Sequence, residues 1–253
     1  MNLFYDLHIH SCLSPCGDED MTPANIAGMA MVKGLDLIAL TDHNSCRNCP
    51  ALLAAAEEYG ILAMPGIEVT TAEEVHAVCL FGNLEAALDF DAYVYARLMK
   101  FPNREEIFGR QQIYDCHDQI CAEEPNLLIN ATEISFQDLW ELALKFDGVM
   151  FPAHIDKNAN SLIANLGFIP PDSCFVTAEV KDLGKLHGLK RDHPYLEGCR
   201  IISNSDAHYL EHINEPRLTL QVEERSRRAV VEALKKRMEI TLSPEAAAPG
   251  SKR

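Results

Sequence analysis

The segment Leu3-Phe4-Tyr5-Asp6-Leu7-His8-Ile9-His10 alternates between apolar and polar side chains. Successive side chains of a β-strand point to opposite faces of the sheet, so this segment predicts a strand with His8 and His10 on one face. Neutral imidazole is a common metal ligand, and two imidazoles side by side form half of a metal site. Taken alone, the pair has a second interpretation, as two histidines at the polar end of an edge strand.

Short apolar strands alternate with helical stretches along the rest of the chain, which predicts an α/β fold with mostly parallel pairing. Thr22 and Pro23 mark the start of a helix that ends before Gly34. A second helix, opened by Pro50, is expected over Ala51–Tyr59, with Gly60 as its C-terminal cap residue. Further strands are expected over 35–41, 61–64, 67–71, 75–81, 149–154, 175–180, 200–204 and 239–242, and further helices over 135–146, 161–167 and 223–237.

More histidines and carboxylates lie on or just after these strands, and most of them are at carboxyl ends. They are Asp42, His43, Glu68, His76, His154, Asp206 and His208. The carboxyl ends of parallel strands meet on one face of an α/β barrel, where such folds gather their active sites. This shared placement favours one metal site over a scatter of surface histidines.

Four segments resemble, in order, the four motifs of the polymerase and histidinol phosphatase (PHP) superfamily: Asp6-Leu7-His8-Ile9-His10-Ser11, Thr41-Asp42-His43-Asn44, His154, and Ser205-Asp206-Ala207-His208. The resemblance runs from residue 3 to about residue 210, and 88–133 match least. It implies a distorted seven-stranded (β/α) barrel with up to three metal ions at the carboxyl ends of the strands. We therefore expect one PHP-type domain over 1–242, an insertion of helices and loops at 88–133 over or beside the site, and a disordered tail over 243–253.

The resemblance also implies three sets of ligands. The first set is His8, His10, Glu68 and Asp206; the second is His43, His208 and a residue shortly after the first motif; the third is Glu68 as a bridge, His76 and His154. Many relatives have Ser-Asp-Gly after the first motif, whereas this chain has Ser14-Pro15-Cys16-Gly17-Asp18. We expect Asp18 as the ligand there, with Cys16 or no protein ligand as the alternatives.

Other charged residues have expected roles around the metals. Asp6 and Asp42 would orient imidazoles through hydrogen bonds, or be ordinary strand-end carboxylates. Arg47, Lys157 and Lys181 are candidates for binding a substrate phosphate, although each also fits a solvated surface charge. Glu179 could line the pocket or simply end its strand. Arg104, Arg110 and His117 belong to the insertion, either at the pocket mouth or on a solvated helical face.

Charge and chemistry together predict a phosphoesterase. Two to three divalent ions, with mixed nitrogen and oxygen ligands that fit Mn, Fe or Zn, would attract a phosphate dianion. The expected reaction is hydrolysis of a small phosphomonoester, including a nucleotide or an oligonucleotide end, by a hydroxide held on the metals. A metal-dependent amidohydrolase or deaminase is the alternative, because His-x-His on a first barrel strand with a late aspartate resembles that superfamily too. The pair Asp206 and His208 and the bridging Glu68 count against it. A domain that keeps its metals without turnover is the remaining alternative.

Composition narrows the partners and the location. The chain has 253 residues and a formal net charge of −16, which disfavours long duplex nucleic acid and anionic membranes as partners. We expect no transmembrane helix, and Met1–Asp6 lacks the basic and apolar regions of a signal peptide. The nine cysteines indicate reduced thiols in a cytoplasmic protein. Among them, Cys46-Arg47-Asn48-Cys49 is interpreted as a thiol pair in a loop.

Overall fold

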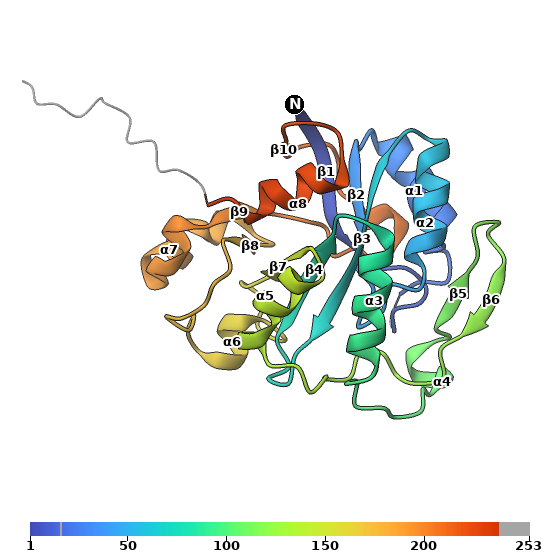
Figure 1. Cartoon of the computed structure of the whole chain (residues 1–253), viewed down its shortest axis with the longest axis horizontal. Helices are drawn as coiled ribbons and strands as arrows, with labels where there is room; N and C mark the ends of the chain where they lie inside the picture. Colours follow the sequence, from blue (N-terminus) through green and yellow to red (C-terminus); the bar gives the residue numbers. More distant parts are fainter. Residues whose placement is uncertain (16, 238–253) are drawn as a thin grey trace, which may run out of the picture.

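The computed structural model describes residues 1–15 and 17–237, and its centre is a curled, mixed β-sheet of six strands in the order β10-β1-β2-β3-β4-β7 (Figure 1). The strands of this sheet are β1 (Asn2–Ile9), β2 (Leu37–Leu40), β3 (Leu62–Thr70), β4 (His76–Phe81), β7 (Gly148–Pro152) and β10 (Thr219–Gln221). Two further pairs are the antiparallel hairpin of β5 (Gln112–Tyr114) and β6 (Ile120–Glu123), and the parallel pair of β8 (Thr177–Glu179) and β9 (Arg200–Ile202).

The helices are α1 (Pro23–Lys33), α2 (Cys49–Glu58), α3 (Leu84–Tyr95), α4 (Glu105–Phe108), α5 (Phe136–Lys145), α6 (Leu162–Leu166), α7 (Leu186–Asp192) and α8 (Arg227–Lys235). Short 3-10 turns span Leu183–Lys185, Pro194–Gly198 and Leu210–His212. None of the helices in the described ranges has both the length and the apolar character that crossing a bilayer requires.

The pairing of the strands is mixed, which corrects the expectation of a mostly parallel sheet. Strands β1, β2 and β3 are parallel, whereas β4 is antiparallel to both β3 and β7, and β10 is antiparallel to β1. The connection between β3 and β4 explains the change of direction. Residues 71–75 are too few for the crossover that a parallel neighbour needs, so the chain must turn back as a hairpin.

The sheet curls so that the segments that follow β1 and β7 both contact the pair β8–β9. Ile9 forms a parallel bridge to Ala207 beyond β9, and the amide of Ile155, beyond β7, donates to the carbonyl of Glu179 at 2.9 Å. Within the described residues the strands thus form a curled sheet and a separate pair, in place of a regular seven-stranded barrel. This half-barrel is compatible with the distorted barrel that the family resemblance implies.

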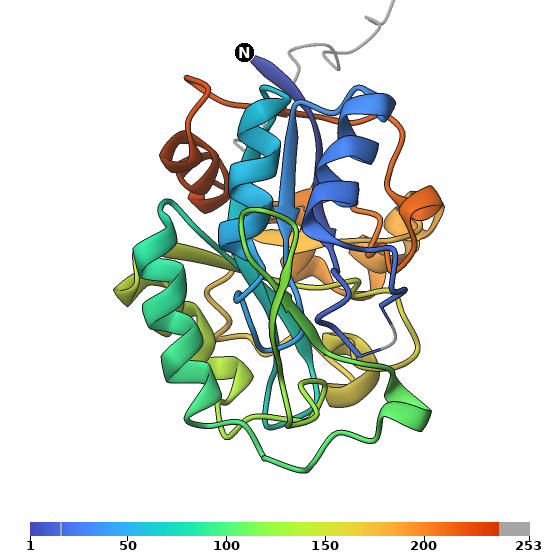
Figure 2. The ribbon, with the colours of Figure 1, turned by 90° about the vertical axis from the view of Figure 1, so that its right-hand side faces the viewer.

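Apolar side chains pack on both faces of the sheet. Helices α1, α2, α3 and α5 contribute to a large cluster on one face, and Figure 2 shows α1 and α2 side by side against the strands. Helix α8 covers the other face, where Val230 and Leu234 join a cluster with Leu3, Leu7 and Val149. The sheet is therefore held between helices on both sides, with its carboxyl-terminal edge left for the site.

Local sequence signals locate several helix ends correctly. The Thr22 hydroxyl accepts a hydrogen bond from the Asn25 amide at 3.2 Å, and Pro23 occupies the first turn of α1. Gly34 ends that helix with φ 76°, a conformation that glycine adopts without steric cost. Ser135 and Ser161 cap α5 and α6 in the same way as Thr22 caps α1.

Strand β3 is one continuous strand, whereas two short strands at 61–64 and 67–71 were expected. It runs through Pro65 and Gly66, and Gly66 lies opposite Leu80 in the antiparallel pairing with β4. A Cβ atom on Gly66 would lie 2.6 Å from Leu80 Cδ2 and 2.9 Å from the Cys79 carbonyl oxygen. The glycine thus permits the close approach of two strands and does not mark a turn.

The region expected as an insertion has two parts with different roles. Helix α3 is capped by Asn83 and buries Ala87, Phe90 and Val94 against the sheet, so its residues belong to the main fold. The chain after α3 forms α4 and the β5–β6 hairpin, which projects beside α2 in Figure 1, and then returns along 124–132. The expected division at 88–133 cuts through α3.

The carboxyl-terminal part also differs from expectation. Helix α8 spans only Arg227–Lys235 of the expected 223–237, because Ser226 caps it. Strand β10, which pairs with β1, had no counterpart among the expected strands. The expected strand at 239–242 and the expected disordered tail at 243–253 lie outside the described residues.

Candidate metal centre

Six of the ten histidines gather at the carboxyl-terminal edge of the sheet with two carboxylates. His8 is the last but one residue of β1 and His10 follows the strand, His43 follows β2, Glu68 lies in β3, and His154 follows β7. Asp206 and His208 follow β9. His76 differs from the others because it is the first residue of its strand, β4. Since β4 is antiparallel to β3, the start of β4 lies beside the end of β3, where His76 pairs with Thr70.

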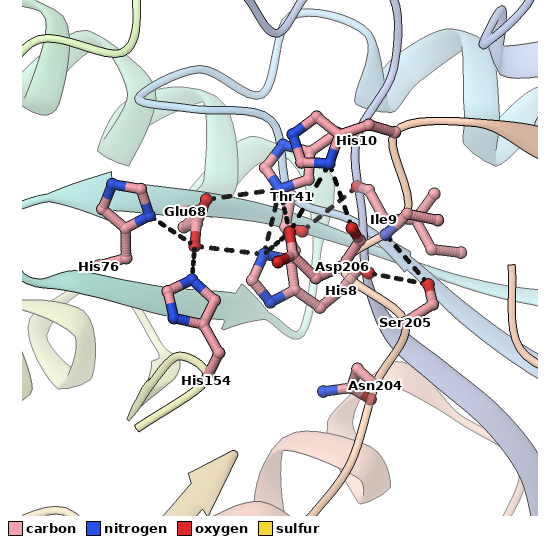
Figure 3. Close-up of polar contacts among 12 residues, drawn as sticks. His8, Ile9, His10, Thr41, Glu68, His76, His154, Asn204, Ser205 and Asp206 are labelled. Atoms are coloured by element: carbon pink, nitrogen blue, oxygen red, sulfur yellow. Dashed lines mark hydrogen bonds and ion pairs between the residues drawn. The ribbon is translucent and has the colours of Figure 1, made fainter. Parts of the chain in front are cut away.

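Glu68 lies at the centre of this cluster and is fully buried (Figure 3). Five imidazole nitrogens surround its carboxylate: His8 Nε2 at 3.2 Å, His10 Nε2 at 3.4 Å, His43 Nδ1 at 2.9 Å, His76 Nδ1 at 3.1 Å and His154 Nε2 at 3.2 Å. One carboxylate thus faces five potential metal ligands, as a bridging ligand must.

Asp206 and His208 close the cluster on the side of β9. The Asp206 Oδ1 atom lies 3.3 Å from His10 Nε2 and 3.6 Å from His8 Nε2. The ring of His208 stacks on that of His10, with centroids 4.2 Å apart. His208 is more exposed than the other members, so it lies toward the mouth of the site.

Within residues 1–15 and 17–237, three groups have ligand atoms that could hold a metal ion, and the atoms of each group lie within 4.8 Å of one another. They are His8, His10 and Glu68; His43, Glu68 and His76; and His10, His43 and His208. The first group contains His8 and His10, and the third contains His43 and His208; the members of each pair were expected to bind the same metal ion. His154 is in none of these groups, although it contacts Glu68 directly. Such buried His/Glu clusters are compatible with a multinuclear metal site.

The charges of the cluster favour ligands in their metal-binding forms. Burial, together with His208 and His43, holds the pKa of His10 well below its usual value, and burial also lowers the pKa of His43 and of His208. Burial alone would raise the pKa of the Glu68 carboxyl, but His76, His8 and His43 hold it well below its usual value. His10, His43 and His208 are therefore neutral beside the ionised carboxylate of Glu68.

His8 has a different electrostatic environment. Burial opposes its protonation, but the carboxylates of Glu179, Glu68 and Asp206 raise its pKa well above the usual value. Glu179 is fully buried, and its Oε2 atom lies 3.0 Å from His8 Nδ1. It also accepts hydrogen bonds from the His154 amide at 3.0 Å and from Asn204 Nδ2 at 2.6 Å. A carboxylate on the far nitrogen of a metal-binding imidazole fixes its tautomer and ring orientation.

His10 is oriented through a hydroxyl. The Ser14 Oγ atom lies 2.9 Å from His10 Nδ1 and donates to Asp42 Oδ1 at 2.6 Å. Asp42 also accepts from the amide and hydroxyl of Ser11. Asp42 thus acts on an imidazole indirectly, one hydrogen bond further away than expected.

Asp6 orients a loop and not an imidazole, which corrects the expectation for this residue. Its two oxygens accept hydrogen bonds from the amides of Ser205 and Asn214, both at 3.0 Å. These bonds fix the segment that carries Asp206. Asp206 itself has φ 49° and His154 has φ 28°, so two members of the cluster hold a backbone conformation that is unfavourable for non-glycine residues.

The uncertain ligand after the first motif is not brought into the cluster. Asp18 is in none of the three groups, and its Oδ1 accepts a hydrogen bond from the Asp20 amide at 3.0 Å. Its own amide donates to the His208 carbonyl, so the backbone of Asp18 lies next to the site, while its carboxylate stabilises a local turn. Cys16 lies outside the described residues.

The three candidate phosphate-binding residues lie in different surroundings. Lys157 forms an ion pair with Asp206 and lines a cavity of about 240 Å³ beside the cluster. The Lys181 ammonium donates to the Ser205 carbonyl. Arg47 instead pairs with Glu124 of the insertion and lies over the ring of Tyr95, 4.4 Å from its centroid.

Residues expected near the pocket mouth lie elsewhere. Arg104, Arg110 and His117 are exposed, and none of them is among the described residues that line the cavity. Cys46 and Cys49 are both buried at the start of α2. The neighbouring Cys49 thiol and burial raise the pKa of Cys46 well above its usual value, so this thiol stays protonated.

Residues 6–235 match the family model described as PHP domain. The chain belongs to the PHP domain family. The match confirms the family resemblance, and its range contains every one of the clustered histidines and carboxylates. The fold of this PHP domain also resembles solved structures. It aligns with the lesion-specific endonuclease PfuEndoQ of Pyrococcus furiosus with a TM-score of 0.62 and 21% identity, over 93% of this chain and 56% of that one.

Two further comparisons concern a solved structure and a protein similar in sequence. An amidohydrolase of Chromobacterium violaceum, solved with bound sulfate and no metal, aligns with a TM-score of 0.56 and 20% identity, over 91% of this chain and 95% of that one. A 5'-3' exoribonuclease of Haemophilus influenzae is 32% identical over 87 residues, which are 34% of this chain and 29% of the relative. The chain spans about half of PfuEndoQ, and its match covers under a third of the exoribonuclease.

Sequence patterns did not assign three residues of the PHP-domain site to their roles: Glu179, Ser14 and Asn204. Glu179 ends β8 and was considered only as a pocket-lining or strand-end carboxylate. Ser14 and Asn204 are polar and close in sequence to motif residues, which is the signal that could have singled them out, and both are buried in the structure. The partner of Asn204 is distant in sequence, since its Oδ1 atom accepts from the Leu7 amide at 2.9 Å.

Proposed function

We propose that this protein is a metal-dependent phosphoesterase that hydrolyses small phosphomonoesters, including nucleotides and oligonucleotide ends. The observation that carries the proposal is the position of Glu68, a buried carboxylate within 3.4 Å of five imidazole nitrogens. Membership of the PHP domain family supports it.

Unsatisfied polar atoms indicate that the cluster is built for metal ions. Among the described residues, His76 Nε2 and His154 Nδ1 are buried without a hydrogen-bond partner, and His43 Nδ1 and Glu68 Oε2 lie 2.9 Å apart without forming a hydrogen bond. A buried polar atom without a partner costs about 1–3 kcal/mol, so several of them in one place are expensive unless a ligand satisfies them. Nitrogen and oxygen donors without thiolates fit Mn, Fe or Zn.

The proposed ligand sets follow the family motifs. His8, His10, Glu68 and Asp206 would hold one ion, His43 and His208 a second with Asp18 as a further candidate, and Glu68, His76 and His154 a third. The contacts of His154 and of Asp206 with this cluster support their inclusion. When bound, such ions activate water as the nucleophile and neutralise the charge that builds on the phosphoryl oxygens.

Lys157 is the proposed phosphate-binding residue. Its ammonium pairs with Asp206 at the cavity, and its side chain is 41% exposed, so a substrate can reach it. A phosphate dianion in the cavity would receive charge-assisted hydrogen bonds from this ammonium. Glu179 and Ser14 would hold the imidazoles of His8 and His10 in place during the reaction.

The test combines metal content with turnover. Protein purified without chelators is analysed by plasma mass spectrometry, and we expect two to three Mn, Fe or Zn per chain. Loaded protein is then assayed with phenyl phosphate, nucleoside monophosphates and short 5'-phosphorylated oligonucleotides. His8→Ala and Asp206→Ala are expected to abolish turnover while far-ultraviolet circular dichroism stays unchanged. His187→Ala, which alters an exposed histidine outside the cluster, should retain wild-type activity.

Other outcomes distinguish the alternatives. Turnover of amides or amino-substituted bases, without turnover of phosphate esters, would support the alternative hypothesis of an amidohydrolase or deaminase. Bound metal without any turnover would support a domain that binds metals without catalysis. Less than about one metal per chain after incubation with each ion would contradict the proposed ligand sets.

A further inference from the structure

The cavity beside the cluster has apolar lining residues to which the proposed function assigns no role. Its ligand side consists of cluster residues, and Lys157 and Asn160 add polar groups. Among the described residues that line it, only Ile129 and Ala159 present apolar side chains. Ile129 comes from the segment that returns after the β5–β6 hairpin, so a residue distant from every motif faces the site.

Asn44 fixes the backbone on both sides of Ile129. Its Nδ2 atom donates to the carbonyls of Leu128 at 2.6 Å and Asn130 at 2.9 Å, and its Oδ1 atom accepts from the Thr70 amide at 3.0 Å. Asn44 directly follows His43 and has φ 49°. One buried side chain therefore ties the segment of Ile129 to a cluster histidine and to the end of β3.

Further hydrogen bonds make this segment rigid. The Gln111 side chain accepts from the Leu128 amide at 2.9 Å and donates to the carbonyls of Glu124 and Asn126 at 2.9 and 2.7 Å. The Glu124 carboxylate is buried and pairs with Arg47. The wall that carries Ile129 is thus a fixed part of the site and has little freedom to withdraw from a ligand.

The side chain of Ile129 is not needed for the core. Leu128 packs with Leu13 and Leu98, but Ile129 belongs to none of the three apolar clusters found among residues 1–15 and 17–237. It is only partly buried, at the edge of a polar cavity. An apolar side chain held rigidly in such a place is available to contact a ligand.

We propose that Ile129 is a specificity-determining residue that packs against the organic group of the substrate. The inference rests on the proposed function and names its substrate class: phosphate esters whose alcohol has an apolar face next to the ester oxygen. The cavity of about 240 Å³ is below the 300–1,000 Å³ that is usual for whole small-molecule ligands, so it fits the phosphate and the first atoms of the alcohol. The phosphate takes the side with the cluster and Lys157, and the alcohol meets Ile129.

The test uses binding as well as turnover. Wild type, Ile129→Ala and Ile129→Leu, each loaded with Mn, are titrated by calorimetry with phenylphosphonate and with methylphosphonate, which lack a hydrolysable ester bond. Loss of apolar contact in Ile129→Ala should weaken phenylphosphonate binding roughly tenfold, and methylphosphonate binding should stay within about twofold. Ile129→Leu keeps the apolar volume and should keep the wild-type preference. Hydrolysis of phenyl phosphate and glycerol 3-phosphate should follow the same pattern, through KM.

The outcomes separate this inference from the proposed function. An unchanged ratio of phenylphosphonate to methylphosphonate affinity in Ile129→Ala would overturn the role of Ile129, whatever the turnover. A selective loss for phenylphosphonate in a protein that hydrolyses neither ester would uphold the contact and overturn the phosphoesterase function. Failure of the wild type to bind either phosphonate would overturn both. Thermal melting of Ile129→Ala at the wild-type temperature confirms that the wall stays folded.

Discussion

The Oε2 atom of Glu179 lies 3.0 Å from His8 Nδ1, while the opposite nitrogen of the same ring lies 3.2 Å from Glu68. His8 is thus held between a carboxylate that orients it and the carboxylate at the centre of the cluster. The two acidic residues come from different sheets, because Glu68 belongs to β3 and Glu179 to β8. The contact between the half-barrel and the β8–β9 pair therefore helps to set the geometry of the candidate metal centre.

Glu179→Gln should weaken metal binding by about 10- to 100-fold, because the amide no longer fixes the His8 tautomer with a full negative charge. Competition with a fluorescent chelator measures the affinity. Glu197→Gln, which alters an exposed carboxylate on a 3-10 turn, is the matched control and should leave affinity unchanged. Equal affinities for Glu179→Gln and the wild type would show that Glu179 has no part in positioning His8.

Ser14→Ala should destabilise the protein by about 1–3 kcal/mol, because its hydroxyl serves Asp42, the His43 amide and His10 in a buried place. Urea unfolding gives the free energy of unfolding, and metal titration of the same variant should show lower affinity. Ser203→Ala lies outside this network and serves as the control. A loss of stability without any loss of metal affinity would mean that Ser14 supports the loop but does not orient His10.

Lys157→Ala should raise KM for a phosphomonoester by about 10- to 100-fold, the value of one charge-assisted hydrogen bond of roughly 1.5–3 kcal/mol. Lys157→Arg keeps the charge and should recover part of the loss. Lys185→Ala removes an exposed ammonium that lies 4.0 Å from Asp156 and should behave as wild type. A fall in kcat with KM unchanged would assign Lys157 to a step after binding.

Metal removal by a chelator should lower the melting temperature. An ion present at 100 times its Kd stabilises the folded state by about 2.7 kcal/mol, which corresponds to roughly 5–10 °C for a domain of this size. Differential scanning calorimetry with and without Mn measures the shift. Glu68→Gln should show a much smaller shift, since the shared ligand is weakened, whereas His187→Ala should show the full one. Identical melting temperatures in both conditions would count against metal binding.

Gly66→Ala should destabilise the sheet by about 1–3 kcal/mol, because the added Cβ would lie 2.6 Å from Leu80 Cδ2 and 2.9 Å from a backbone oxygen. Gly188→Ala is a matched control within α7, where no atom lies within 4 Å of the new Cβ. There alanine should stabilise the helix by about 0.5–1 kcal/mol. Urea denaturation of both variants checks the opposite signs, and equal effects would contradict the close packing of β3 on β4.

The sequence pattern was sufficient to predict that the histidines lie at one edge of the sheet. Period-two alternation placed His8 and His10 on one face, and their rings lie 5.1 Å apart. Placement on or just after the expected strands added Glu68, His154 and Asp206, which contact one another or these histidines. Such residues are predictable because strand ends and motif spacing are local properties of the chain.

Other features depend on tertiary contacts and could not be predicted in the same way. The hydrogen bonds of Asp6 go to the amides of Ser205 and Asn214, almost the whole chain away. The role of Glu179 depends on the contact between the β8–β9 pair and β1. Helix α3 was not predicted because charged and aromatic residues are mixed in its sequence, although the helix packs on the sheet. Strand β10 has only three residues, too few to show a period.

The bridge between Ile9 and Ala207, with the bond from the Leu7 amide to Asn204, has a consequence for biosynthesis. On the ribosome, the segment that carries His8 and His10 emerges before the segment that carries Asp206 and His208, which follows almost 200 residues later. The nascent chain therefore exposes its imidazoles well before it can complete the centre. Such high contact order slows folding, so loading of the metals is expected as a late event, after synthesis of both segments.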